Sequence, residues 1–150
     1  MFYFICYDLE TGGLDKNPIT EIALIVYDAE TLKEVDRFES LIKPYDNLTL
    51  EPKALEVTGI TKEMLKQGEQ IEDIVEVLIA IFETYTKGSS KFKLKPILVG
   101  HNIQEFDNKF LEYAFERQEK NLYDYIGGSQ DTLNLGRARW VGQQKKFNLA

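Results

Sequence analysis

The fold of this chain is decided by the stretch Phe2-Tyr3-Phe4-Ile5-Cys6-Tyr7-Asp8-Leu9-Glu10-Thr11-Gly12-Gly13. Its first half is apolar on both faces of an extended backbone, which predicts a central strand over residues 2–10. Asp8 and Glu10 are two residues apart, so their carboxylates point to the same face of that strand. Crowded like charges need a positive partner, and divalent cations such as Mg²⁺ and Mn²⁺ prefer carboxylate oxygens. The stretch therefore predicts a metal-dependent site at the end of a central strand.

The bulk composition is that of one globular domain. The 150 residues are 43% hydrophobic and 12% aromatic, which suits a single core. The single cysteine, Cys6, excludes an internal disulfide and fits a reducing compartment. No apolar run is long enough to cross a bilayer and no signal-peptide pattern is present, so we expect a cytoplasmic protein without membrane contact. The net charge of −7 argues against a long nucleic-acid footprint, but not against an enzyme that grips a few nucleotides.

The remaining sequence predicts a mixed α/β sheet. Short turns connect strands over 2–10, 19–28 and 34–42, which is typical of an antiparallel meander. A strong apolar stripe predicts a helix over 71–85, which can carry the chain back so that the next strand, 96–99, is parallel. The expected helices, in chain order, are 51–57, 61–66 (with Thr61 as N-cap), 71–85 and 103–119.

A third carboxylate stands at the start of the last predicted helix. Asn102 and Glu105 have the spacing of a capping pair, which places Asp107 in the second turn. Asp107 then shares a helix face with Phe110 and Leu111. Such a carboxylate either pairs with a lysine or a nearby loop, or joins the strand-end acids in holding metal. We favour the metal interpretation.

Four segments together resemble one family. Residues 8–14 contain an acid pair followed by threonine and glycine, and residues 100–107 form a Gly-His-Asn…Phe-Asp run. Residues 54–61 and the Asp-Thr-Leu run in 131–137 lie between and after these motifs. In this order they resemble the DEDD superfamily of 3′–5′ exonucleases, also called the RNase T or DnaQ-like family, although Thr58 stands where the family usually has histidine. The resemblance covers essentially the whole chain, so we expect one exonuclease-like domain over residues 1–150.

The resemblance implies an RNase H-like fold, with a five-stranded mixed sheet flanked by helices. It also implies a two-metal hydrolase that uses Mg²⁺ or Mn²⁺. The implied substrate is the 3′ end of single-stranded or frayed DNA or RNA, from which nucleoside monophosphates are released. A polymerase or another replication or repair protein is the implied partner. The sequence does not separate DNA from RNA.

The resemblance also assigns site residues. Asp8, Glu10 and Asp107 are the implied catalytic metal ligands. Residues implied to contact the terminal nucleotide are Leu9, Thr11, Gly12, Leu14, Asn102 and Phe106. For Leu14 and Phe106 the alternative is that both are simply core residues.

The chain departs from the family at its end. The family's third motif carries a fourth acid and a His or Tyr that handles the attacking water, and it would follow residues 146–150. Three interpretations are open. The chain is a C-terminally incomplete exonuclease, which we favour; it is a non-catalytic module that binds nucleic acid or protein; or another subunit supplies the missing acid.

The other chemically suggestive residues have ordinary structural explanations. We interpret His101 as structural rather than as the base, and Cys6 as a small buried residue rather than a nucleophile. Asp131 is a spare carboxylate that we expect in a turn or cap. The lysine-rich segment 87–95 is interpreted as a solvated connection in preference to a substrate contact. Trp140 suits either base stacking or helix packing.

Overall fold

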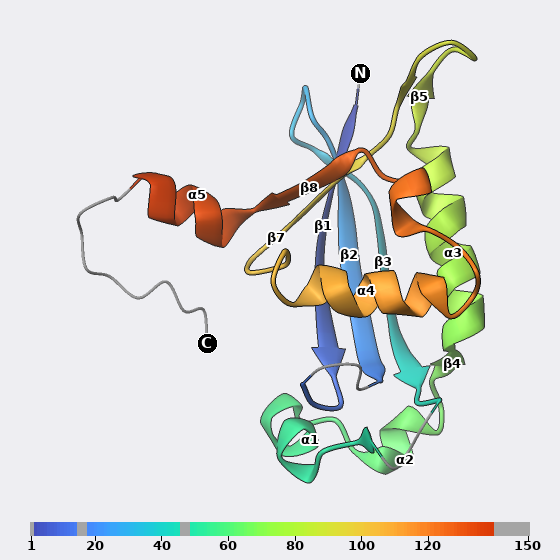
Figure 1. The fold of residues 1–150 in the computed structure, drawn as a ribbon, viewed down its shortest axis with the longest axis vertical. Coiled ribbons are helices and arrows are strands. Elements are labelled where there is room, and N and C mark those ends of the chain that lie inside the picture. The colour runs from blue at the N-terminus through green and yellow to red at the C-terminus, as the bar shows by residue number, and fades with distance from the viewer. Residues whose placement is uncertain (1, 15–17, 46–48, 140–150) are drawn as a thin grey trace.

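A mixed sheet forms the centre of the molecule in the computed structural model, which describes residues 2–14, 18–45 and 49–139 (Figure 1). Within these residues six strands pair in the order β4-β3-β2-β1-β7-β8. Their bounds are β1 (Tyr3–Thr11), β2 (Ile19–Asp28), β3 (Glu34–Lys43), β4 (Glu69–Gln70), β7 (Ile97–Gly100) and β8 (Gly128–Asp131). The predicted mixed sheet is confirmed, with six strands in place of five because two residues of β4 pair with the end of β3.

The opening stretch is central, as predicted. β1 pairs antiparallel with β2 and parallel with β7, and β2 pairs antiparallel with β3. The meander and the parallel return are therefore confirmed. Side chains of β1 alternate between a buried face, which includes Tyr7 and Leu9, and a more open face, which includes Asp8 and Glu10. This alternation sends the acids to one side of the sheet and the core to the other.

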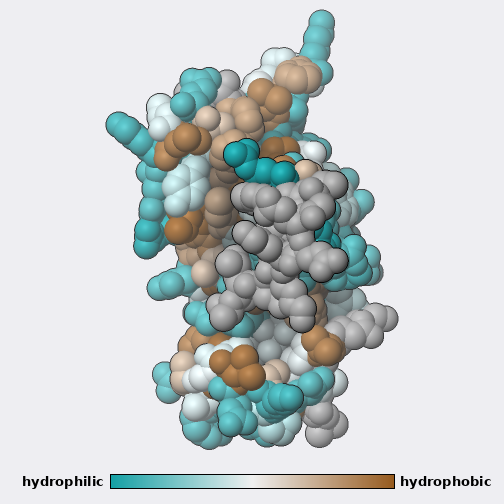
Figure 2. Space-filling model, turned by 90° about the vertical axis from the view of Figure 1, so that its left-hand side faces the viewer, coloured by the Kyte–Doolittle hydropathy of each residue, from teal (hydrophilic) through white to brown (hydrophobic). Residues whose placement is uncertain are grey.

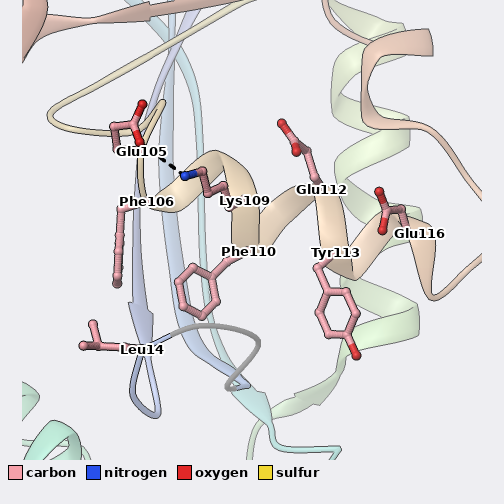
Figure 3. A pocket seen from close by; sticks show the side chains of 8 residues that line it. All are labelled: Leu14, Glu105, Phe106, Lys109, Phe110, Glu112, Tyr113 and Glu116. Carbon is pink, nitrogen blue, oxygen red and sulfur yellow. Dashed lines mark hydrogen bonds and ion pairs between the residues drawn. The ribbon is translucent and has the colours of Figure 1, made fainter.

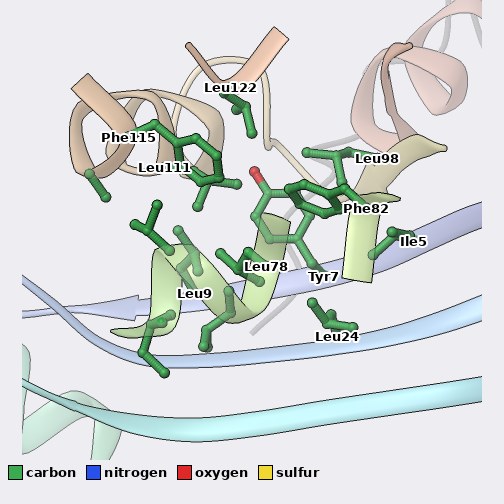
Figure 4. Close-up of a cluster of buried hydrophobic side chains, with 14 of the residues drawn as sticks. Ile5, Tyr7, Leu9, Leu24, Leu78, Phe82, Leu98, Leu111, Phe115 and Leu122 are labelled. Atoms are coloured by element: carbon green, nitrogen blue, oxygen red, sulfur yellow. The ribbon is translucent and has the colours of Figure 1, made fainter. Parts of the chain in front are cut away.

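The helices are α1 (Pro52–Thr58), α2 (Lys62–Leu65), α3 (Ile71–Thr84), α4 (Asp107–Glu116) and α5 (Thr132–Arg139), with a 3-10 turn η2 (Leu122–Asp124) after α4. The buried face of the sheet packs against α3 and α4. In Figure 1, α4 crosses in front of the strands, α3 runs along their right side, α1 and α2 lie below them, and α5 extends to the left. Figure 4 shows Leu78 and Phe82 of α3 and Leu111 of α4 packed against Tyr7 and Leu9. Each fully buried side chain of this kind contributes about 1.5–3 kcal/mol, so this layer fixes α4 against β1.

The predicted start of the last long helix is wrong. α4 begins at Asp107, with Phe106 as N-cap, and ends at Glu116 instead of spanning 103–119. Asn102 has a φ of 58° and lies in the left-handed region, so it cannot open a right-handed helix. The capping pair does not form, and Asp107 is in the first turn rather than the second. The N-cap role of Thr61 is confirmed, because its Oγ1 accepts a hydrogen bond from the Met64 N–H.

The lysine-rich segment is ordered. It forms a separate two-stranded hairpin of β5 (Lys87–Gly88) and β6 (Lys93–Leu94), which extends from the top of the molecule in Figure 1. The predicted solvated connection is exposed as expected, but the prediction missed that it forms a hairpin.

Candidate active site

The strand-end acids share the open face of β1. Asp8 is exposed and Glu10 is half-buried, and both point away from the core face that holds Tyr7 and Leu9. Burial, and then the charges of Asp8 and Glu21, raise the pKa of Glu10 above its ordinary value. The predicted common direction of the two carboxylates is confirmed, and their mutual repulsion is visible in this shift.

Asp107 lies against the same part of β1. Its side chain is only 5% exposed, and its Oδ2 accepts a hydrogen bond from the backbone N–H of Leu9 at 3.1 Å. Leu9 stands between the two strand-end acids, so this bond anchors α4 beside them. Burial is the largest cause that raises the pKa of Asp107, to about 6, and the charges of Asp8 and Glu10 add to it. The three predicted metal ligands thus lie close enough for the charges of Asp8 and Glu10 to raise the pKa of Asp107.

The chemistry of this donor set fits a hard divalent cation. Three carboxylates repel one another without a cation, and oxygen is the ligand atom that Mg²⁺ and Mn²⁺ prefer. In the part of the chain that the structure describes, no three His, Cys, Asp or Glu side chains lie close enough to hold an ion as they stand. Asp8, Glu10 and Asp107 therefore lie near the same end of β1, but their carboxylates are too far apart to coordinate one ion as they stand.

A glycine turn follows the acid pair. The Thr11 hydroxyl donates to the Gly13 carbonyl, and the Gly12 N–H donates to the Pro18 carbonyl. A Cβ on Gly12 would lie 2.4 Å from a methyl carbon of Leu50, so a larger residue there would displace the Leu50 side chain. The predicted nucleotide contacts through Leu9, Thr11 and Gly12 remain predictions. Polar groups of all three have partners within the chain.

A buried carboxylate shapes the loop before α4. Asp131 is 1% exposed, and its Oδ1 accepts hydrogen bonds from the N–H groups of Asn102 and Leu133, each at 2.9 Å. Its Oδ2 accepts another from the Gln104 N–H at 3.0 Å. The expected turn-and-cap role of Asp131 is confirmed. Asn102, a predicted nucleotide contact, is consequently held in an exposed position next to the site.

A second buried polar contact was not predicted. The Tyr7 hydroxyl donates to Oδ1 of Asn108, whose Nδ2 donates to the Ser129 hydroxyl at 2.9 Å. This chain of bonds links β1, α4 and β8, directly beside Asp107. The signal in the sequence was a second polar residue, Asn108, at the start of an apolar helix face.

An elongated hollow of about 420 Å³ runs along α4 (Figure 3). Two predicted substrate contacts line it: Leu14, which is 70% exposed, and Phe106, which is half-buried. The Phe106 ring lies 4.9 Å from that of Phe110, between centroids. Figure 3 shows the rings of Phe106, Phe110 and Tyr113 pointing to the same side of the helix. Leu14 and Phe106 are accordingly not simple core residues.

His101 and Cys6, the other residues with possible catalytic chemistry, lie in environments that suit a structural role. His101 is half-buried, with its Nδ1 3.2 Å from the Thr132 hydroxyl. Burial raises the pKa of the Cys6 thiol, which makes a reactive thiolate less accessible. Trp140 and residues 146–150 lie outside the described residues.

Solved nuclease structures share this fold. E. coli Exonuclease I in complex with a dT13 oligonucleotide superposes with a TM-score of 0.79 at 22% identity, over 99% of this chain and 32% of that one. An ExoI/SSB-Ct complex gives a TM-score of 0.80 at 22% identity, over 99% of this chain and 32% of that one. The fold that positions the acids is therefore the fold of Exonuclease I.

The sequence comparisons specify the family. The RNase_T exonuclease family model matches residues 5–139, and the chain belongs to this family, within the DEDD superfamily of 3′–5′ exonucleases. A DNA polymerase III PolC-type protein of Halalkalibacterium halodurans is 34% identical over 89% of this chain and 8% of its own length. Ribonuclease T of Photorhabdus laumondii is 34% identical over 77% of this chain and 55% of its own. The chain thus spans a small part of the first relative and about half of the second.

The helices of the described residues were also compared with the length and apolarity that a membrane span requires. None of those helices satisfies both conditions.

Proposed function

We propose that this chain is a 3′–5′ exonuclease domain that hydrolyses phosphodiester bonds at the 3′ end of single-stranded or frayed DNA or RNA, releasing nucleoside monophosphates. Membership of the RNase_T exonuclease family supports the reaction class. The observation that carries the proposal is the placement of buried Asp107 on the Leu9 N–H, between Asp8 and Glu10. Three carboxylates at one strand end are otherwise a costly arrangement.

In this proposal Asp8, Glu10 and Asp107 hold two divalent ions, Mg²⁺ or Mn²⁺. Bound ions of this kind activate a water molecule and stabilise the leaving oxygen. The Leu9 N–H orients the Asp107 carboxylate, and the packed α4 keeps it against β1. The raised pKa values of Glu10 and Asp107 fit the donor set, because a cation would relieve the repulsion that raises them.

The hollow along α4 supports a single-stranded or frayed end. Leu14 and Phe106 offer apolar surface to a terminal base, and stacking on such surface does not depend on base identity. A base must leave its pair to use this surface, so a fully paired end is a poorer substrate. Asn102 is exposed, and in this proposal its side chain contacts the same nucleotide. The polymerase relative makes a polymerase a reasonable partner, which we propose with the same function.

The test is degradation of a 5′-labelled single-stranded oligonucleotide with Mg²⁺, Mn²⁺ or EDTA. We expect a ladder that shortens from the 3′ end, only with metal, and that disappears in Asp107→Asn. The matched control is Asp73→Asn, which removes an exposed carboxylate from α3 and should leave the ladder intact. Binding of the oligonucleotide without degradation under every metal condition would instead indicate the non-catalytic module.

A further inference from the structure

The hairpin β5–β6 is a basic feature on an acidic protein. Four lysines, and no acid, fall within residues 87–95 of a chain whose net charge is −7. Figure 2 shows hydrophilic side chains projecting at this end of the molecule. The proposed hydrolysis uses none of these residues, so their concentration requires its own explanation.

The hairpin has a defined conformation. The N–H of Ser89 donates to the Phe92 carbonyl at 2.8 Å, and the N–H of Phe92 donates back at 3.2 Å, which closes a two-residue turn. Gly88 has a φ of 120°, and a Cβ there would lie 2.2 Å from the Phe92 carbonyl oxygen. Glycine is therefore required for the closure, and the lysines are displayed on an ordered scaffold.

The lysines are arranged around a polar hollow. Lys93 and Lys95 are two apart in an extended segment and point to one side of the hairpin. With Lys87 and the turn residues Ser89 and Ser90, they line a hollow of about 480 Å³ between the hairpin and the segment that follows α4. Two acids, Glu83 and Asp124, line it as well, so the ammonium groups outnumber the carboxylates.

The charges of the hairpin are only partly compensated. Lys87 donates to the Thr84 carbonyl at 3.2 Å and lies over the Tyr3 ring, but among the described residues none of the four hairpin lysines belongs to an ion pair. The remaining lysine, Lys91, is exposed in the turn, and next to it Phe92 is 65% exposed. An excess of ammonium groups over carboxylates, beside an exposed aromatic ring, is a combination that binds single-stranded nucleic acid.

The hairpin and the candidate active site lie at opposite ends of the sheet. β1 and β7 are parallel, with Phe4 paired to Ile97, so the hairpin precedes the amino end of β7 while Glu10 lies toward the carboxyl end of β1. The six steps from Phe4 to Glu10 span about 20 Å of strand. The hollow also lies on the side of the sheet that α3 covers, whereas Asp8 and Glu10 are on the open side. A nucleic-acid strand that reaches both places must therefore be many nucleotides long and pass around the sheet, and a terminal nucleotide alone could not reach both.

We propose that the β5–β6 hairpin is a second, sequence-independent contact for the phosphate backbone of single-stranded nucleic acid, on the 5′ side of the end held at the active site. This inference rests on the proposed function. The hairpin lysines bind phosphates, while Phe92 offers a ring for stacking. An acidic peptide could use the same ammonium groups, but the exposed ring and the nucleolytic family favour a nucleic acid.

The test compares Lys93→Gln/Lys95→Gln with the control Lys33→Gln/Lys53→Gln, which removes the same charge from exposed lysines elsewhere. Binding to labelled oligothymidylates of about four and about twenty nucleotides is measured by anisotropy in EDTA, across a salt series. We expect the hairpin variant to lose about tenfold in affinity for the long strand, with a salt slope reduced by about 1.4 for two lost phosphate contacts. Affinity for the short strand and both results for the control should match the unmodified chain.

Hydrolysis of the short strand with Mn²⁺ separates this inference from the proposed function. The hairpin variant should degrade it at the unmodified rate. If the unmodified chain degrades nothing, the proposed function fails, while the length-dependent binding still tests the hairpin. Equal losses in the hairpin and control variants would overturn the hairpin contact. So would a hairpin variant that loses affinity for labelled polyglutamate while its affinity for the long strand is unchanged, because the lysines would then serve an acidic peptide.

Discussion

Two buried aspartates on neighbouring elements have opposite surroundings. Asp131 is 1% exposed and accepts backbone hydrogen bonds from Asn102, Gln104 and Leu133. Asp107 is 5% exposed, and burial is the largest cause that raises its pKa, to about 6. Hydrogen bonds from backbone N–H groups lower this pKa, but the charges of Asp8 and Glu10 raise it further. Both side chains are buried, so burial alone does not identify a carboxylate as part of a functional site. A carboxylate satisfied by backbone donors holds a loop, whereas one facing like charges is suited to a cation.

The first prediction tests whether Asp107, unlike Asp131, serves catalysis. Asp107→Asn should reduce metal-dependent hydrolysis about 100-fold or more, because one oxygen ligand loses its charge. The metal-free protein should remain folded, since a repelling carboxylate has gone. Turnover and circular dichroism of the same preparation check both expectations. Undiminished turnover would remove Asp107 from the site.

The next effect is on stability. Asp131→Ala should lower the free energy of unfolding by about 2–4 kcal/mol, because three backbone N–H groups lose a charged acceptor. Urea denaturation in EDTA measures this loss. Asp73→Ala, at an exposed position in the first turn of α3, should cost at most about 1 kcal/mol. A loss in Asp131→Ala no larger than in this control would contradict the loop-holding role.

The third prediction concerns how the free energy of unfolding depends on pH through Asp107. The pKa of Asp107 is higher in the folded protein than its ordinary value of 3.8, so the folded state binds the proton more tightly. Without metal, the contribution of Asp107 to stability is therefore fully present below about pH 4 and is lost as pH rises through about 6, a change on the order of 2 kcal/mol. Denaturation curves in EDTA should show the fall in the unmodified chain. A fall of the same size in Asp107→Asn would assign it to other groups.

The smallest expected effect comes from metal addition at neutral pH. Mn²⁺ at about ten times its dissociation constant should stabilise the unmodified chain by about 1.4 kcal/mol. Asp107→Asn should show little of this gain, whereas Asp73→Asn should retain it in full. Thermal unfolding with and without Mn²⁺ provides the measurement, and an equal gain in all three proteins would place the ion elsewhere.

The sequence predicted the parts of the site that depend on local periodicity. Period-two alternation put Asp8 and Glu10 on one face, and the apolar stripe of α3 put its helix over the core. The start of α4 was predicted wrongly because Asn102 and Glu105 match a capping pattern locally. The backbone donors of that loop are instead satisfied by Asp131, which is 29 residues from Asn102 along the chain. No local pattern contains that information.

Strand β8 illustrates the same limit. Gly128-Ser129-Gln130-Asp131 has no apolar alternation, so propensity does not predict a strand there. Its four residues pair in parallel with β7, from Ile97–Gly128 to Gly100–Asp131. The strand exists because β7 offers an unpaired edge. Contacts of this kind depend on the assembled sheet.

The Asp131 hydrogen bonds also impose an order on biosynthesis. In the loop that leads into Asp107, the N–H groups of Asn102 and Gln104 donate to the carboxylate of Asp131. A nascent chain that has emerged only as far as α4 therefore contains all three candidate metal ligands but lacks the acceptor that holds this loop. Contacts between distant parts of a chain form late in folding. The candidate nuclease site therefore matures only after translation has passed it, and a ribosome-bound intermediate carries the acids before it can position them.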